Sequence, residues 1–345
     1  MNTSVKKNKP IFWVGLFFVT LVSGLGSFWL WQELFTAKPL IEPAVIEPQA
    51  AAPKARRPID GLWTEAGVAT SSVFGAMIDN EPLGRPPVGL AQAALVSEAP
   101  IEGGATRWLA IWPAASAPDK IGPIRSARPY FLDWIKEVNG LYLHVGGSPQ
   151  ALDDLKTKGI ANLNEYYRGW YFWREAGRPR PHNVFTSGEL VNRALADYPR
   201  VAKIVSAEII SWPYQEEVKA LERDLVEPSP IDFGLVQVTW RYDREKNAYE
   251  RWQNEAKQLD ASGAVLSAKN VIYLYTDIRT IDRIGRQEIR TLGSGRVVVA
   301  RDGRLIAGRW RKDSPESRTR FFDEQAQEIQ LNAGLTWIEV LRSNN

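Results

Sequence analysis

The sequence predicts an α+β protein in three parts: an N-terminal transmembrane helix, a mixed α/β first domain and a mostly antiparallel β second domain. Three observations lead to this prediction. Positions 10–32 form a long apolar run without a charge. Strand-like and helical patterns alternate from about position 70 to 205, whereas strand patterns dominate from 231 to 345. The 345 residues are enough for two domains besides the anchor.

The apolar run predicts a membrane anchor over residues 1–35. At about 1.5 Å per residue, a helix over 10–32 is about 34 Å long and would cross the hydrocarbon layer. Three lysines precede the run and Glu33 follows it. The positive-inside rule therefore places the N-terminus in the cytoplasm and the body of this single-pass protein outside it, in the cell envelope. A cleaved signal peptide is the alternative, but its apolar region would be shorter and would end in small residues.

Residues 36–58 predict a linker, because prolines recur among alanines with little that could pack. The first domain is expected over 59–205. Short apolar runs at 73–78, 94–96, 108–112 and 141–145 predict strands. Three helices are expected from the following signals: apolar spacing at Phe131, Trp134, Ile135 and Val138; an N-terminal Ser148-Pro149 pair; and a capping box at Thr186 and Glu189.

A connector is expected over 206–230, with a short helix around 215–224. The second domain follows over 231–345. Apolar residues alternate with polar ones from 236 to 242, which predicts a half-buried strand. Further strands are expected at 270–276, 296–300 and 336–340, and Asp302-Gly303 predicts a hairpin turn that leads into a strand through 305–310.

Composition excludes several kinds of site. The chain has no cysteine, which rules out disulfides, thiolate nucleophiles and a lipid-modified cysteine. It has two histidines, so a three-histidine metal site is impossible. The net charge of +3 is small and the charges are mixed along the chain, so nucleic acid is not an expected partner.

Several strings resemble the YerB-like bacterial lipoprotein family, a two-domain family without an established biochemical role. The resemblance covers roughly residues 57–342 and is carried by AMIDN at 76–80, SEAPIEGG at 97–104, KIGPIRSAR at 120–128, HVGGSPQ at 144–150, PHN at 181–183, LSAKN at 266–270 and LTWIEV at 335–340. It implies an envelope location and an N-terminal plus C-terminal domain pair. The missing cysteine departs from a lipoprotein pattern.

The first domain contains a candidate anion-binding site. Arg125 and Arg128 precede one predicted helix, and Gly146, Gly147 and Ser148 precede the next. Helix starts present free N–H groups, glycine lets the backbone approach a ligand, and arginine offers two parallel donors to phosphate or carboxylate. The alternative is that the glycines form a tight turn and that the arginines pair with nearby glutamates.

Five further residues are weaker candidates for acid–base or metal-binding roles. They are Asp79, Glu98, Glu102, His144 and His182. The carboxylates could hold a hard cation or move a proton, and either histidine could act as a base. Salt bridges to arginine and structural hydrogen bonds are the alternative roles. The aromatic and arginine-rich loop at 166–181 could stack on sugar rings or cover the core.

These features predict a membrane-anchored binding or scaffold protein of the cell envelope that holds an anionic ligand, such as a glycan or a lipid-linked phosphate. One alternative is an enzyme that transfers or hydrolyses lipid-linked phosphate groups, in which Glu98 or Glu102 would hold Mg²⁺ or accept a proton. Another is a structural module for protein–protein interaction. The sequence identifies no cofactor and no particular metal.

Overall fold

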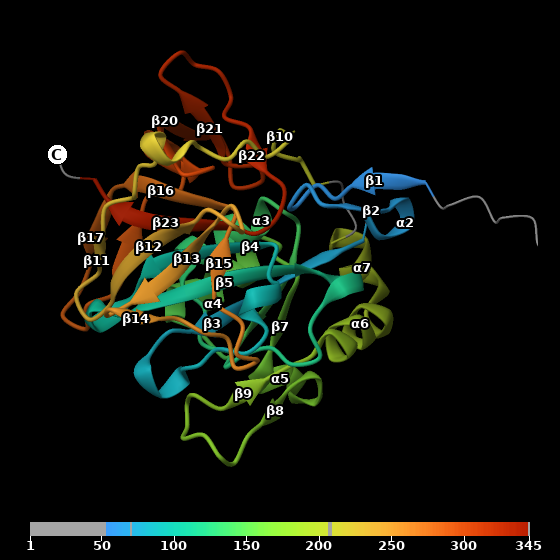
Figure 1. Ribbon diagram of the computed structural model, residues 1–345. Coiled ribbons are helices and arrows are strands. Elements are labelled where there is room, and N and C mark those ends of the chain that lie inside the picture. The colour runs from blue at the N-terminus through green and yellow to red at the C-terminus, as the bar shows by residue number, and fades with distance from the viewer. Residues whose placement is uncertain (1–52, 70, 206–208, 344–345) are drawn as a thin grey trace, which may run out of the picture. The chain divides into compact units, whose positions relative to one another are not determined.

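A mixed ten-stranded sheet runs through the protein (Figure 1). The computed structural model describes residues 53–69, 71–205 and 209–343. The strands, in spatial order, are β21 (Arg320–Asp323), β20 (Arg304–Lys312), β19 (Gly293–Arg301), β16 (Asn270–Thr276), β23 (Thr336–Arg342), β4 (Leu95–Pro100), β5 (Thr106–Pro113), β3 (Val73–Asp79), β6 (Leu141–His144) and β7 (Asn162–Asn164).

Strands from the two ends of the described chain meet at the centre of this sheet. β23 pairs in parallel with β4, in a register that sets Thr336 opposite Leu95 and Glu339 opposite Glu98. On one side of this junction lie β4, β5, β3, β6 and β7, and on the other β23, β16, β19, β20 and β21. The two predicted domains therefore share one sheet, and residues 52–345 form one compact unit.

A second sheet packs beside the first. It contains β11 (Ile231–Asp232), β12 (Gln237–Asp243), β13 (Ala248–Gln253), β14 (Ala256–Lys257) and β15 (Ser267–Ala268). Four short pairs complete the strands: β1 (Lys54–Arg56) with β2 (Trp63–Glu65), β8 (Trp173–Arg174) with β9 (Val184–Phe185), β10 (Tyr214–Gln215) with β22 (Leu331–Asn332), and β17 (Ile278–Thr280) with β18 (Gln287–Ile289).

The helices are short, and their starts follow local sequence signals. The α-helices are α2 (Ala66–Ala69), α3 (Pro129–Lys136), α4 (Pro149–Thr157), α5 (Glu165–Arg168), α6 (Gly188–Asp197) and α7 (Pro199–Val205). The 3₁₀ turns are η1 (Pro82–Gly84), η2 (Leu90–Gln92), η3 (Glu102–Gly104), η4 (Ala114–Ser116), η5 (Gly169–Tyr171) and η6 (Glu222–Asp224). Ser148 caps α4 as predicted. The cap of α6 is Ser187, one residue after the predicted Thr186.

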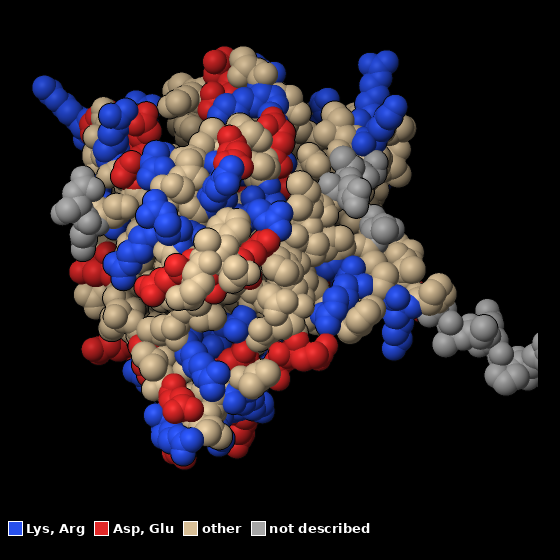
Figure 2. All heavy atoms as spheres, turned by 90° about the horizontal axis from the view of Figure 1, so that it is seen from above, with Lys and Arg blue, Asp and Glu red and all other residues tan. Residues whose placement is uncertain are grey.

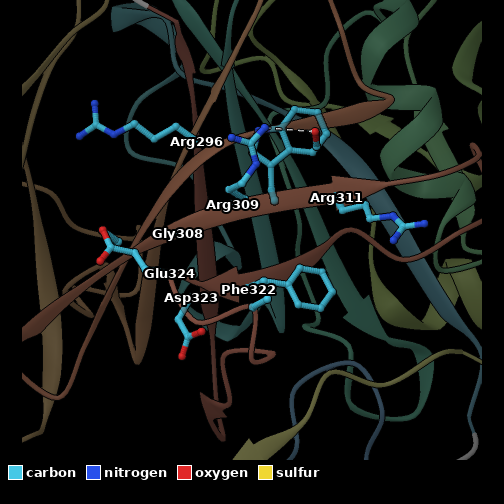
Figure 3. A pocket seen from close by; sticks show the side chains of 11 residues that line it. Arg296, Gly308, Arg309, Arg311, Phe322, Asp323 and Glu324 are labelled. Atoms are coloured by element: carbon cyan, nitrogen blue, oxygen red, sulfur yellow. Dashed lines mark hydrogen bonds between the residues drawn. The ribbon is translucent and has the colours of Figure 1, made fainter.

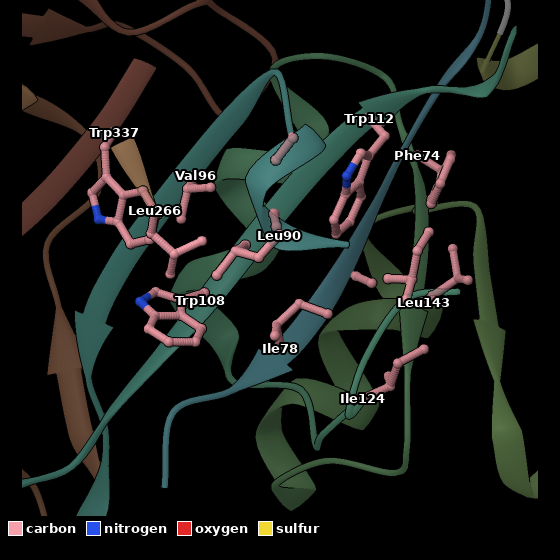
Figure 4. Packing of buried hydrophobic residues seen from close by; sticks show 14 of the residues in the cluster. Phe74, Ile78, Leu90, Val96, Trp108, Trp112, Ile124, Leu143, Leu266 and Trp337 are labelled. Atoms are coloured by element: carbon pink, nitrogen blue, oxygen red, sulfur yellow. The ribbon is translucent and has the colours of Figure 1, made fainter. Parts of the chain in front are cut away.

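Alternate side chains of the central strands pack into two hydrophobic cores, one on each face of the sheet. Phe74, Ile78 and Trp112 belong to one cluster, whereas Met77 and Leu109 belong to the other. The first cluster also joins the two sheets through tryptophans (Figure 4). Its members Trp108 and Trp240 lie 5.9 Å and 5.3 Å, between ring centroids, from Trp337.

The predicted fold class is wrong, and one helix expected in the connector is not found. The described fold is mostly β, and its first part is not a separate α/β domain but half of a shared sheet. The short helix expected around 215–224 is replaced by strand β10 and the turn η6. In residues 53–69, 71–205 and 209–343, no helix has the length and apolar character needed to cross a membrane. The transmembrane helix predicted over 10–32 lies outside the described residues.

Candidate functional site

A pocket of about 470 Å³ lies where loops of the first part meet the β11–β12 turn of the second. We call it the arginine pocket. Its lining residues are Asn80, Glu81, Pro82, Arg85, Ile101, Glu102, Gly103, Ala105, Arg107, Arg125, Arg128, Leu235, Val236 and Asn254. It thus contains two of the predicted anion-binding residues, Arg125 and Arg128, and two arginines that the sequence reading did not single out.

Strand pairing brings these arginines together. Arg107 is the second residue of β5 and lies opposite the end of β3, where its register partner is Asp79. The segment that contains Arg125 runs along the other side of β3, because the Arg125 N–H donates to the Met77 carbonyl at 2.8 Å. The second part closes the pocket through the Leu235 N–H, which donates to the Gly104 carbonyl at 3.0 Å.

The two predicted arginines are both engaged by carboxylates. Arg128 makes a two-pronged ion pair with Glu102, with Nε and Nη2 each 2.8 Å from a carboxylate oxygen. Arg125 Nη2 donates to Glu81 at 2.6 Å, and Arg125 Nε lies 3.1 Å from Asp79 Oδ2. That Nε is buried and its N–H is not directed into a hydrogen bond. The ion pair of Arg128 with Glu102 therefore corresponds to the alternative prediction, in which the arginines pair with nearby glutamates. It partly neutralises the positive charge of the site.

Arg85 and Arg107 have weaker electrostatic compensation. Among the described residues, Arg85 forms no ion pair, and its guanidinium donates to the backbone and side-chain oxygens of Asn80. Arg107 is buried, donates to the Ser126 carbonyl at 2.7 Å, and lies 3.7 Å from Glu81. Its Nε has no hydrogen-bond partner.

The pocket consequently has more positive than negative groups. Four guanidinium groups and two carboxylates line it. Burial, together with Arg128 and Arg125, lowers the pKa of Arg107 to about 10. Burial first, and the neighbouring arginines second, thus disfavour the charged form of Arg107. No local motif marks Arg85, whereas Arg107 belongs to the string that follows the Gly103-Gly104 turn.

The other half of the predicted anion site has a structural role. Gly146 adopts a left-handed conformation at φ 59°, and its N–H donates to Asn164 Oδ1 at 3.0 Å. Gly147 pairs with Ala127, so the turn supports the Arg125–Arg128 segment from behind. The Ser148 hydroxyl accepts the Ala151 N–H of α4 at 3.3 Å. None of Gly146, Gly147 and Ser148 lines the arginine pocket.

The two histidines occupy different surroundings. His144 is buried, its Nδ1 lies 2.7 Å from the Gly146 carbonyl, and burial lowers its pKa, so it stays neutral and holds the glycine turn. His182 is also buried, and its Nδ1 lies 2.6 Å from Asp79 Oδ2. Asp79 thereby links His182 to Arg125 just beneath the pocket. This orients the imidazole, but His182 does not line the pocket.

Glu98 belongs to a buried charge cluster at the junction of the two halves. Its Oε2 accepts from Arg251 Nη2 at 2.6 Å, and both side chains are fully buried. Glu339, its register partner, accepts the Trp240 indole N–H at 2.8 Å. Burial and the neighbouring Glu98 raise the pKa of Glu339 well above its usual value. The cluster is closed to ligands and serves the junction.

The predicted metal-binding carboxylates and the aromatic loop at 166–181 can each be compared with the structure. In the described parts of the chain, no three His, Asp or Glu side chains gather in a way that could hold a metal ion. Glu98 and Glu102 instead face different arginines. In the aromatic loop, Tyr171 and Phe172 are buried, whereas Tyr166, Tyr167 and Trp170 are more than half exposed. The loop therefore covers the core and also presents exposed aromatic side chains, although Arg168 lies over the Trp170 ring.

A larger hollow of about 790 Å³ lies on the outer face of β19–β21 (Figure 3). Arg296, Arg309 and Arg311 lie in it, together with Asp323 and Glu324, and Arg311 pairs with the nearby Asp313. These charges are mostly exposed, so water and salt screen them. Basic and acidic side chains are interspersed in the same manner over the face seen in Figure 2. The arginine pocket differs from these surfaces because its charges are partly buried and in excess.

Comparison with known proteins agrees with the two-part organisation. Residues 60–200 match the family described as "Protein of unknown function (DUF3048) N-terminal domain", and residues 231–338 match the corresponding C-terminal domain. "Putative lipoprotein YerB" of Bacillus subtilis (strain 168) is 28% identical over 275 residues, which cover 76% of this chain and 79% of that protein. The crystal structure of YerB from Bacillus subtilis superposes with a TM-score of 0.74 and 26% identity, covering 84% of this chain and 97% of that one.

Proposed function

The chain belongs to the two-domain DUF3048 or YerB-like family, and we propose that it is a binding protein of the cell envelope that holds an anionic ligand in the arginine pocket. Its relative's name as a lipoprotein is consistent with a membrane-associated position outside the cytoplasm. The ligand would carry phosphate or acidic glycan groups. The predicted boundaries at 59–205 and 231–345 stay a prediction for the two sequence domains, which share one sheet in the fold.

The observation that carries this proposal is the incomplete compensation of two positive charges. Arg85 forms no ion pair among the described residues, and Arg107 has only a 3.7 Å contact with Glu81. Each buried or half-buried guanidinium normally acquires a carboxylate partner, because an uncompensated charge inside a protein is costly. Here four arginines share three carboxylates, Asp79, Glu81 and Glu102, and Arg107 Nε remains without an acceptor. A phosphate or carboxylate group would supply the missing acceptors, since it matches the parallel donors of arginine.

The enzyme alternative gains less support. In that alternative, Glu98 or Glu102 would hold Mg²⁺ or accept a proton. Glu98 is fully buried against Arg251, and Glu102 is held by Arg128. Neither carboxylate is placed to serve a reacting group without first losing its ion pair. A binding function requires no such rearrangement.

A thermal-unfolding series on the purified protein tests the proposal. The ligands are pyrophosphate, a short polyprenyl phosphate and peptidoglycan fragments, because a ligand that binds only the folded state raises the melting temperature. We expect at least one of them to raise it in the wild type and not in Arg85→Gln. The matched control is Arg244→Gln, an exposed arginine at the β12–β13 turn, far from Leu235 and Asn254 along that hairpin. No shift with any ligand would contradict the proposal.

A further inference from the structure

Exposed aliphatic residues lie on three segments that border the arginine pocket. Leu235 lines the pocket and is 68% exposed. Leu83 follows the lining residue Pro82 and is 61% exposed. Ile284 is 72% exposed. We call these three residues the aliphatic collar.

The position of Ile284 follows from its neighbour. A Cβ atom built on Gly285 would lie 3.7 Å from the Gly103 N atom, and Gly103 lines the pocket. The β17–β18 turn therefore abuts the rim formed by η3. Single exposed aliphatic residues are common on protein surfaces and need no explanation. Here, however, three such residues lie on three separate segments that border one charged pocket. This clustering calls for an explanation.

Exposed basic residues accompany the collar. Arg283 precedes Ile284 and is exposed, and it forms no ion pair within the described residues. The loop that holds Arg180, also exposed and unpaired among those residues, approaches the collar, since Arg178 Nη1 donates to the Gly84 carbonyl at 2.9 Å. Aliphatic groups beside basic ones suit a ligand with an apolar body and an anionic head.

We propose that the ligand of the arginine pocket is a lipid-linked phosphate, whose phosphate groups enter the pocket while its hydrocarbon chain lies on the aliphatic collar. This inference rests on the proposed function and makes it more specific. The arginines would bind the head through charge-assisted hydrogen bonds. The collar would remove part of the chain from water, which is favourable in proportion to the apolar area covered. A soluble phosphate would use only the first of these contributions.

The test compares ligands that share a head group, by calorimetric titration of the full chain. The probes are pyrophosphate, farnesyl diphosphate and farnesol. We expect farnesyl diphosphate to bind more tightly than pyrophosphate by about tenfold or more, because burial of even two CH₂ groups supplies that factor. In Leu83→Ser/Ile284→Ser, which changes two collar residues that do not line the pocket, we expect this advantage to vanish while the affinity for pyrophosphate stays unchanged. The matched control, Ile210→Ser/Leu221→Ser, replaces aliphatic residues that are about half exposed and do not line the pocket, and it should keep the advantage.

The possible results separate the two proposals. If farnesyl diphosphate and pyrophosphate bind equally, the collar has no role and this inference fails, while the anion pocket stands. If neither binds, the proposed function fails as well. If farnesol binds as tightly as farnesyl diphosphate, the phosphate groups contribute nothing to binding, and both proposals fail. Flotation with phosphatidylglycerol vesicles is the last arm. Vesicle binding that the double variant abolishes, without any farnesyl advantage, would assign the collar to the bilayer surface instead.

Discussion

Replacing Glu98 with glutamine should destabilise the protein far more than the same replacement of its neighbour Glu339. Arg251 Nη2 donates to Glu98 at 2.6 Å, and Arg251 Nε lies 4.0 Å from Glu339. Removing one partner of a buried ion pair costs about 3–5 kcal/mol. We expect about 3 kcal/mol for Glu98→Gln, the lower end of that range, because Glu339 can ionise in its place.

The Glu339→Gln variant should be nearly neutral. Burial and the neighbouring Glu98 raise the pKa of Glu339 well above its usual value and so favour its protonated form. A glutamine oxygen can still accept the Trp240 indole N–H, so we expect a change within about 1 kcal/mol. Urea unfolding of both variants at pH 7 gives the comparison. A larger loss in Glu339→Gln than in Glu98→Gln would refute the reasoning, since it would make Glu339 the charged partner of Arg251.

The same cluster gives a pH dependence with a definite sign. The folded state holds the Glu339 proton more tightly than the unfolded chain does, since its pKa is raised above 4.5. The corresponding stabilisation is complete below pH 4.5 and is lost as the pH rises through the raised pKa. Glu339→Gln removes this contribution. The difference in unfolding free energy between variant and wild type should therefore shift in favour of the variant as the pH increases, and a constant difference would contradict this.

Two further predictions concern the supports of the pocket and the sheet. Burial acts to raise the pKa of Glu137, but Lys312 and Arg318 outweigh it and lower that pKa. The stabilisation from the ionised Glu137 is therefore present above the ordinary pKa of 4.5 and is lost as the pH falls through the lowered pKa of the folded state. Glu137→Gln should lower the unfolding free energy by about 3–5 kcal/mol in urea unfolding at pH 7. A loss below about 1 kcal/mol would count against the buried ion pair. Gly146→Ala should lower the unfolding free energy by about 1–2 kcal/mol or more, because φ is 59° and the new Cβ would lie 2.7 Å from Tyr166 Cε2; an unchanged melting temperature would contradict this.

Local patterns predicted individual elements well. The run at 270–276 coincides with β16, and the Asp302-Gly303 turn joins β19 to β20 with both residues at positive φ. The predicted helix start at Ser148-Pro149 is confirmed for α4. These signals lie within a few residues of one another, so the chain expresses them through local hydrogen bonds and caps.

The sheet as a whole could not be predicted in this way. The parallel pairing of β23 with β4 joins Thr336 to Leu95, and no local pattern specifies a partner so far away in the sequence. The buried strands also lack the alternation of apolar and polar residues that would distinguish the two faces of the sheet. All of β3 and β5 is buried, because successive side chains point into the core on one face or the other.

The candidate site was predicted in part for the same reason. Arg125 and Arg128 stood out because they precede a helix with proline at its first turn. Arg85 and Arg107 come from other segments and reach the pocket only through tertiary pairing. The anion-binding role of Gly146 and Gly147 stays a prediction. In the fold their turn supports a strand-like segment and does not line the arginine pocket.

The most direct test of the account is a calorimetric titration of pyrophosphate into the wild type, Arg85→Gln and Arg244→Gln. Loss of a charge-assisted contact should weaken binding by about tenfold or more. The account predicts that the wild type and Arg244→Gln bind pyrophosphate alike and that Arg85→Gln binds at least that much more weakly. Equal binding by all three proteins, or no binding by the wild type, would contradict the claim that the arginine pocket is an anion site.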